Sequence, residues 1–279
     1  MKKYILLLFV ICLGLVGCEK HETNDKVMQI IGSGSYTSDN IKQIARLIEQ
    51  SDDLTIDEAR NLYMEVGDFI RLYAEHLTDS LNNRLNDQSL SGEEMRELLK
   101  EIDRLGGEMD ETCVEVFKVE GQVVYGIAPI FLPNVFKSYI TEAEYRFAEI
   151  EQMEYNMPST IDDEEVISYQ EIANRLWACD ELMMDTACAA ELKSSITASV
   201  NSYMITLMYG TENSPAFDWE DGRMNADTKD AILNYVSDHP DAPSAETLKR
   251  YIEVLEKSRY YDTPATRQFF YNFLKPNDK

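Results

Sequence analysis

A capped, amphipathic segment at about residues 55–85 constrains the fold of this chain most. Thr55 and Glu58 have the spacing of a capping box, in which the two side chains satisfy backbone N–H groups at the start of a helix. Apolar residues then recur every three or four positions: Ala59, Leu62, Tyr63, Val66, Ile70, Tyr73, Leu77 and Leu81. This spacing predicts a long helix whose apolar face must be covered by other elements.

Similar signals predict helices along most of the remaining chain. Capping boxes at Ser91–Glu94 and Thr141–Glu144 open two of them, and the acidic residues 162–165 open another. Further helices are predicted to begin near residues 39 and 188 and to cover residues 226–236, 244–257 and 264–274. We therefore expect a mainly α fold, an irregular helical bundle or solenoid of about eight helices.

Two segments allow more than one interpretation. Residues 112–127 favour a small β-hairpin that turns at Glu120-Gly121, although the spacing of Met109, Cys113 and Val116 also fits a helix. Residues 194–211 carry no charged side chain. We interpret them as a central, buried helix, with a strand as the alternative because β-branched residues are frequent there.

The charge balance limits the classes of partner. The chain has 51 acidic residues against 26 lysines and arginines, which gives a formal net charge of −25. Binding to nucleic acid requires clustered basic side chains, so the sequence predicts no nucleic-acid partner. Adsorption to an anionic lipid surface through protein charge is disfavoured for the same reason.

The first eighteen residues carry the clearest motif. Lys2 and Lys3 precede an uncharged apolar run, Tyr4–Val16, which is shorter than the roughly 20 residues needed to span a bilayer. Leu15-Val16-Gly17-Cys18 follows and resembles the lipobox of bacterial lipoproteins. The resemblance implies cleavage before Cys18 and attachment of lipid to its sulfur and amino group. An ordinary secretory signal peptide with an incidental cysteine is the alternative.

The resemblance implies a domain organisation and an address. We expect a signal peptide at residues 1–17, a flexible polar tether at 18–38 and a helical domain at 39–279, with a subdivision allowed near 128–140. Val27, Met28, Ile30 and Ile31 interrupt the polar tether, and docking of these apolar residues on the body is the alternative for them. The protein would be lipid-anchored in the bacterial cell envelope, with the outer membrane favoured over the inner one. Its partners would be the membrane, through the N-terminal lipid, and an envelope protein or glycan.

One loop combines residues that suit ligand binding. Asp218, Trp219, Glu220 and Asp221 place carboxylates on both sides of an aromatic ring in a connection that contains Pro215 and Gly222. Such a set could stack on a sugar, hold a cation or supply a paired acid and base. The alternative is a solvated loop in which Phe217 and Trp219 are both anchored in the core.

Other catalytic signals are absent from the sequence. It contains no phosphate-binding loop, nucleophile elbow or metal-binding spacing of His and Cys, so we predict no cofactor and no metal. Cys179 and Cys188 could form a disulfide or remain buried free thiols. We therefore expect a binding or interaction module without catalysis, and the alternative is an envelope glycan hydrolase that uses the acids near 218–221.

Overall fold

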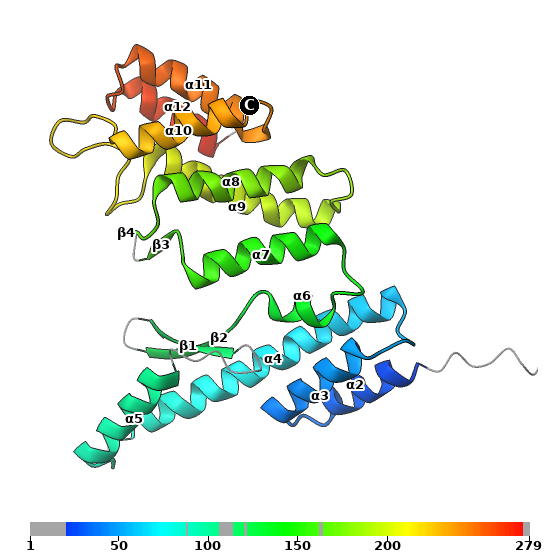
Figure 1. The fold of residues 1–279 in the computed structure, drawn as a ribbon. Helices are drawn as coiled ribbons and strands as arrows, with labels where there is room; N and C mark the ends of the chain where they lie inside the picture. The colour runs from blue at the N-terminus through cyan, green and yellow to red at the C-terminus, as the bar shows by residue number, and fades with distance from the viewer. Residues whose placement is uncertain (1–20, 88, 106–113, 120–121, 162–163, 276–279) are drawn as a thin grey trace, which may run out of the picture. The chain divides into compact units, whose positions relative to one another are not determined.

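The chain is mainly helical and divides into two compact units, an N-terminal unit (Met1–Ile140) and a C-terminal unit (Thr141–Lys279). The structure is a computed structural model that describes residues 21–87, 89–105, 114–119, 122–161 and 164–275. Within these residues, 11 helices and two small antiparallel sheets are present, and Figure 1 shows them in chain order. The mainly α class is confirmed, with more helices than the predicted eight.

The N-terminal unit is built around one long helix. Its helices are α2 (Glu22–Gly32), α3 (Ser38–Glu49), α4 (Ile56–Leu85), α5 (Gly92–Leu105) and the short α6 (Phe131–Val135). Its strands are β1 (Val114–Val119) and β2 (Gln122–Ile127). Helix α4 begins where the sequence predicts, because both hydrogen bonds of the Thr55–Glu58 capping box are formed. Its buried face, which includes Leu62, Val66 and Phe69, packs in one core with α2, α3 and α6.

The predicted β-hairpin is confirmed by the pairing of β1 with β2. The ladder runs from Val114 opposite Ile127 to Val119 opposite Gln122. Asn82 of α4 donates to the Val123 carbonyl at 2.9 Å, which fixes the hairpin to the helix. Residues 114–119 and 122–127 therefore form strands, the conformation that their β-branched residues favour.

The segment predicted as a flexible tether is a helix in most of its length. Residues 22–32 form α2, and Val27 is completely buried against the rest of the N-terminal unit. The expectation of a coil at 18–38 is therefore wrong for these residues. Its apolar residues Val27, Ile30 and Ile31 lie on one helical face, and covering this face stabilises the helix. Cys18 lies outside the described residues.

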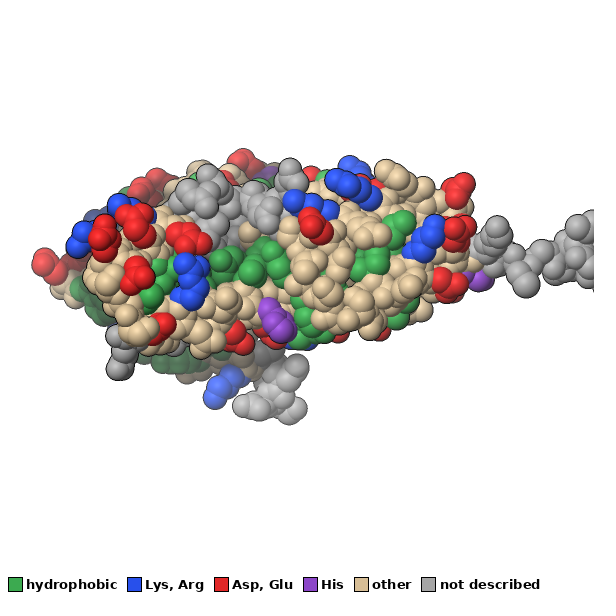
Figure 2. All heavy atoms as spheres, turned by 90° about the horizontal axis from the view of Figure 1, so that it is seen from below, with side chains coloured by type: hydrophobic (Ala, Val, Ile, Leu, Met, Phe, Trp, Pro, Cys, Tyr) green, Lys and Arg blue, Asp and Glu red, His purple; other side chains and the backbone are tan. Residues whose placement is uncertain are grey.

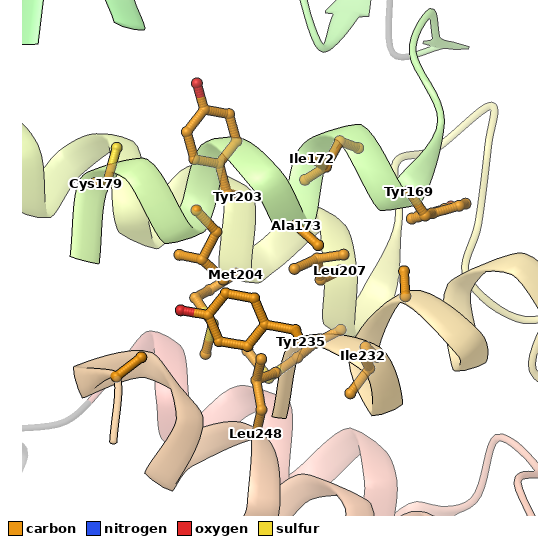
Figure 3. Close-up of a cluster of buried hydrophobic side chains, with 14 of the residues drawn as sticks. Tyr169, Ile172, Ala173, Cys179, Tyr203, Met204, Leu207, Ile232, Tyr235 and Leu248 are labelled. Carbon is orange, nitrogen blue, oxygen red and sulfur yellow. The ribbon is translucent and has the colours of Figure 1, made fainter. Parts of the chain in front are cut away.

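The C-terminal unit contains the other large core. Its helices are α7 (Glu142–Asn156), α8 (Tyr169–Met184), α9 (Ala190–Tyr209), α10 (Ala226–Asp238), α11 (Pro243–Lys257) and α12 (Pro264–Leu274). Figure 3 shows side chains of α8, α9, α10 and α11 meeting in this core, among them Ile172, Met204, Tyr235 and Leu248. Helix α12 covers the predicted residues 264–274, with Thr263 as its cap and Pro264 in its first turn.

The predicted helix start at residues 162–165 is wrong. Thr160–Ile161 and Glu164–Glu165 instead form the short antiparallel pair β3 and β4. Helix α8 begins later, where the Ser168 hydroxyl accepts the backbone N–H of Glu171 at 3.2 Å. Acidic residues suit a first turn, but here a Ser at the N-cap position determines the start.

Helix α9 confirms the helical interpretation of residues 194–211, but only one face of it is buried. Ile196, Tyr203 and Leu207 lie in the core. The other face is exposed and carries small polar or neutral side chains: Ser194, Ser195, Thr197, Ala198, Asn201 and Ser202. Charged side chains are scattered over much of the surface, as the face in Figure 2 illustrates. The outer face of α9 is therefore an uncharged part of a strongly acidic chain.

Candidate functional site

The loop with the four predicted ligand residues connects α9 to α10 in the C-terminal unit. It doubles back on itself through isolated β-bridges between Gly210 and Pro215 and between Phe217 and Met224. A further bridge joins Arg223 to Tyr261, which lies in the turn between α11 and α12. The loop is therefore a short, braced hairpin, and we call residues 217–224 the acidic hairpin.

Gly210 fixes the base of this loop. Its φ angle of 78° lies in the left-handed region, which residues with a side chain rarely adopt. A Cβ atom there would lie 2.4 Å from both the Ala216 nitrogen and the Ser214 oxygen. Only glycine allows the chain to pass this close to itself.

The carboxylates of Asp218 and Asp221 shape the tip of the acidic hairpin. Asp218 Oδ1 accepts the backbone N–H groups of Glu220 at 2.8 Å and Asp221 at 3.1 Å. Asp221 Oδ1 accepts the backbone N–H of Arg223 at 2.7 Å. Side-chain acceptors of this kind are typical of Asx turns, so one oxygen of each carboxylate is used to hold the backbone.

Trp219 projects from this tip into solvent. Its exposed fraction is 76%, whereas Phe217 is buried and packs edge-on against Tyr209. The interpretation that both aromatic residues are anchored in the core is therefore right for Phe217 and wrong for Trp219. Phe217 lies in the bridged part of the hairpin, where one face covers the core, and Trp219 lies beyond it in the turn. The result is a large aromatic ring held outward on an ordered turn.

A second turn with an unusual backbone braces the acidic hairpin. Arg259 and Tyr260 have φ angles of 57° and 62°, a conformation that costs about 1 kcal/mol or more for residues other than glycine. The Tyr260 carbonyl accepts the Met224 N–H at 2.8 Å, and the Gly222 carbonyl accepts the Asp262 N–H at 2.7 Å. These hydrogen bonds fix the two turns side by side.

A surface depression of about 440 Å³ lies beside these turns. It is lined by side chains of both charges and by one aromatic ring, including Asp218, Asp221, Arg223, Lys229, Asp230 and Tyr260. Lys229 Nζ lies 4.3 Å from the centre of the Tyr260 ring, a cation–π contact. Such a lining offers hydrogen-bond donors and acceptors to a polar ligand. Within the described residues, no group of three or more His, Cys, Asp or Glu side chains is arranged to hold a metal ion.

The C-terminal unit has a second hollow on its surface, between α9, α11 and α12. This groove of about 500 Å³ is lined by apolar and amide side chains with a single cation, among them Asn201, Ile205, Arg250, Phe269 and Phe273. The Arg250 guanidinium carbon lies 5.9 Å from the centre of the Phe269 ring. The one sequence signal for this groove is the uncharged run at 194–211, which predicts a buried helix rather than an exposed face.

Ionisable groups around the buried Arg175 form a separate network that links helices. Arg175 of α8 donates to Glu154 of α7 at 2.6 Å and to the Met157 carbonyl at 2.9 Å, and the Tyr203 hydroxyl donates to Glu154 at 3.1 Å. Burial alone would raise the pKa of Glu154, but hydrogen bonds from Ser159 and the Arg175 guanidinium outweigh it and lower that pKa. Each of these polar groups is hydrogen-bonded to another group of the same chain, which indicates a structural role.

The described cysteines, and His21 and His239, also lie in surroundings that indicate a structural role. Cys179 and Cys188 are buried free thiols, and burial raises the pKa of Cys179 to about 12. His239 stacks on Trp177 with ring centres 3.9 Å apart. His21 contacts Glu58 with 2.5 Å between Nδ1 and Oε1. A thiol with so high a pKa is a poor nucleophile.

In the described residues, every helix is too short or too polar to span a bilayer.

The comparisons with known proteins add no relative. No protein-family model, curated protein or solved structure matches this chain.

Proposed function

We propose that this chain is a lipid-anchored protein of the bacterial cell envelope whose helical body binds a partner without catalysis. The lipobox-like sequence that ends at Cys18 supports the anchor. As in the sequence analysis, the outer membrane is favoured over the inner one. The C-terminal unit supplies the binding surface.

The exposure of Trp219 is the observation that carries the binding proposal. Water in contact with a large aromatic ring is unfavourable, so a Trp that is 76% exposed gains free energy when a partner covers it. The turn below it is already ordered by Asp218 and Asp221, so little conformational entropy is lost on binding. A preorganised, exposed Trp is typical of a binding hot spot.

The surroundings of Trp219 suit a glycan best, with an envelope protein as the other partner class. The flat face of an indole can stack on a sugar ring, and nearby carboxylates can accept hydrogen bonds from sugar hydroxyl groups. The depression that Asp218 and Asp221 line adds Lys229, Asp230 and Tyr260 as polar contacts. No positively charged patch is needed for such a neutral ligand.

Tryptophan fluorescence tests this proposal directly, because the chain has only 2 tryptophans. In a Trp177→Phe variant the signal comes from Trp219 alone. We expect soluble fragments of envelope polysaccharide to shift its emission, and Trp219→Ala to abolish binding in calorimetry. If no glycan binds, but a photo-crosslinker at position 220 captures a single envelope protein and Trp219→Ala prevents the capture, the partner is a protein. Unchanged binding in Trp219→Ala would refute the assignment of this surface.

The alternative function, glycan hydrolysis, is favoured by one observation: Asp218 and Asp221 line the same depression. Glycoside hydrolysis requires two carboxyl groups about 5–10 Å apart on either side of the scissile bond. Here both carboxylates come from one turn, and each uses an oxygen to accept backbone N–H groups. Hydrolysis of a polysaccharide that is lost in both Asp218→Asn and Asp221→Asn would establish this alternative.

The anchor is tested separately from the binding surface. Cys18→Ser should prevent lipid labelling and release the protein from the membrane fraction. Mass spectrometry of the wild-type protein should find acyl chains on the residue at position 18. A Cys18→Ser protein that remains labelled and bound to membranes would contradict the proposed anchor.

A further inference from the structure

The start of α2 limits how far the body can lie from a lipid at Cys18. Helix α2 begins at Glu22, so only Glu19, Lys20 and His21 separate it from Cys18. Even a fully extended chain covers at most about 3.6 Å per residue, so this link spans no more than about 14 Å. A flexible tether of 20 residues would instead give a root-mean-square separation of about 25 Å.

Two contacts fix the point where the chain leaves the N-terminal unit. The Thr23 N–H donates to Asp53 Oδ2 at 3.1 Å, and His21 contacts Glu58 in the first turn of α4. Hydrogen bonds from Thr23 hold the pKa of Asp53 well below its usual range, so this carboxylate stays charged and keeps the contact. The start of α2 is therefore attached to the loop before α4 and to the first turn of α4.

The surface next to this exit point carries an exposed apolar side chain. Ile56, the first residue of α4, is 59% exposed. The exposed carboxylates of Asp52 and Asp57 lie on either side of it in the sequence. An exposed Ile between acidic groups suits the headgroup layer of zwitterionic lipids, whose ammonium groups can neutralise the acids while the side chain enters the interface. An anionic lipid surface would repel the same residues.

We propose that the loop Ser51–Thr55 and the first turn of α4 rest on the zwitterionic headgroup layer of the membrane that holds Cys18, with Ile56 inserted. This inference rests on the proposed lipid attachment at Cys18. The short link keeps the exit point at the bilayer, and the contacts of Asp53 and Glu58 make this loop and turn the surface beside it.

The opposite end of α4 lies away from the membrane in this arrangement. Helix α4 has 30 residues, so its two ends are about 45 Å apart. Helix α5 is joined to the C-terminal end of α4 by an ion pair between Arg84 and Glu101 at 2.9 Å. Leu99 of α5 is 46% exposed. Exposed acids along α4, including Glu65, Asp68 and Glu75, disfavour lying flat on lipid, since these charged groups would lose hydration along the whole helix. Leu99 is therefore a matched control for Ile56.

Fluorescence quenching by brominated lipids tests the inference. The lipidated, full-length protein with Trp177→Phe and Trp219→Phe has no native Trp left. Ile56→Trp then places one reporter at the start of α4, and Leu99→Trp places one on α5, which is joined to the far end of α4. In phosphatidylcholine vesicles brominated just below the headgroups, we expect the emission of Ile56→Trp to fall at least about twofold and that of Leu99→Trp to stay unchanged.

Flotation of the same vesicles separates failure of this inference from failure of the anchor. If the protein floats with the vesicles but Ile56→Trp is not quenched, or both reporters are quenched equally, the proposed orientation is wrong. If the protein does not float, the lipid attachment itself is refuted, and this inference with it. Circular dichroism of both variants checks that their helix content is unchanged. We expect no change, because both substituted side chains are exposed.

Discussion

Asp180 of α8 accepts the backbone N–H of Ser244, in the first turn of α11, at 3.0 Å. The residue at the N-cap of α11 is Ala242, which has no side-chain acceptor of its own. Asp180 also accepts hydrogen bonds from the Ser244 hydroxyl, at 3.1 Å, and from the hydroxyl of Tyr235 in α10. One buried carboxylate thus caps one helix and joins it to two others.

Removing this carboxylate should strongly destabilise the C-terminal unit. Asp180→Ala leaves three buried donors without an acceptor, so we expect the free energy of unfolding to fall by about 3 kcal/mol. Tyr235→Phe removes only one donor and should cost about 1 kcal/mol. Urea denaturation followed by circular dichroism measures both. Asp241→Ala, an exposed acid in the loop before α11, is the control and should have little effect. A loss for Asp180→Ala no larger than this control would contradict the capping role.

The network around Glu154 predicts a dependence of stability on acid. Because the pKa of Glu154 is lower in the folded protein than its ordinary value of 4.5, its contribution is present above pH 4.5 and is lost as the pH falls through the folded pKa. Because the Glu154 side chain is 35% exposed and water screens part of its interaction with Arg175, Glu154→Gln should be less stable than wild type by about 1 kcal/mol at pH 7, with a difference that shrinks below pH 4.5.

Denaturation with urea between pH 7 and pH 3 measures this difference. Glu149→Gln, an exposed acid on the same helix, is the matched control and should follow the wild type at every pH. A constant difference between Glu154→Gln and wild type across this range would show that ionisation of Glu154 does not stabilise the fold.

The docking of α2 predicts that residues within the expected tether matter for stability. Val27 is completely buried, so Val27→Ala should cost about 2 kcal/mol through lost burial and the cavity that remains. Its neighbour Met28 is 40% exposed, and Met28→Ala should cost less than about 0.5 kcal/mol. Thermal unfolding of the two variants tests this difference. Equal midpoints would mean that α2 adds nothing to the core.

Two glycines of the loop between α9 and α10 should differ sharply on substitution. Both Gly210 and Gly222 have positive φ angles, which cost about 1 kcal/mol for alanine. A Cβ at Gly210 would also collide with the backbone of Ser214 and Ala216, whereas nothing lies within 4 Å of a Cβ at Gly222. In a Trp177→Phe background, we expect Gly210→Ala to displace the loop and to change the emission wavelength of Trp219. Gly222→Ala should leave this wavelength unchanged. The same emission in both variants would argue against a fixed loop base.

The sequence predicts local features of this fold well. The starts of α4, α5 and α7 follow from capping boxes, because every hydrogen bond of such a box lies within a few residues. Helix α2 was missed because what fixes its start is Asp53, which lies 30 residues away in the sequence. No local pattern reveals such a partner.

The candidate site was predictable in composition but not in geometry. The sequence predicts Asp218 and Trp219 as members of one ligand loop, and the structure places Asp218 at the depression and Trp219 in solvent. Which aromatic side chain enters the core depends on the bridge between Phe217 and Met224 and on the distant turn at Tyr260, so sequence spacing did not separate Phe217 from Trp219. The outer face of α9 was interpreted as buried because helical periodicity cannot distinguish a buried face from an uncharged exposed one.

That outer face of α9 has a consequence for how the protein responds to its surroundings. Its hydroxyl and amide groups do not titrate, and they gather no counterions. Changes in salt or acidity will alter the repulsion between copies over the carboxylate-covered parts of the surface. The affinity of the α9 face for another molecule should stay nearly constant under the same changes.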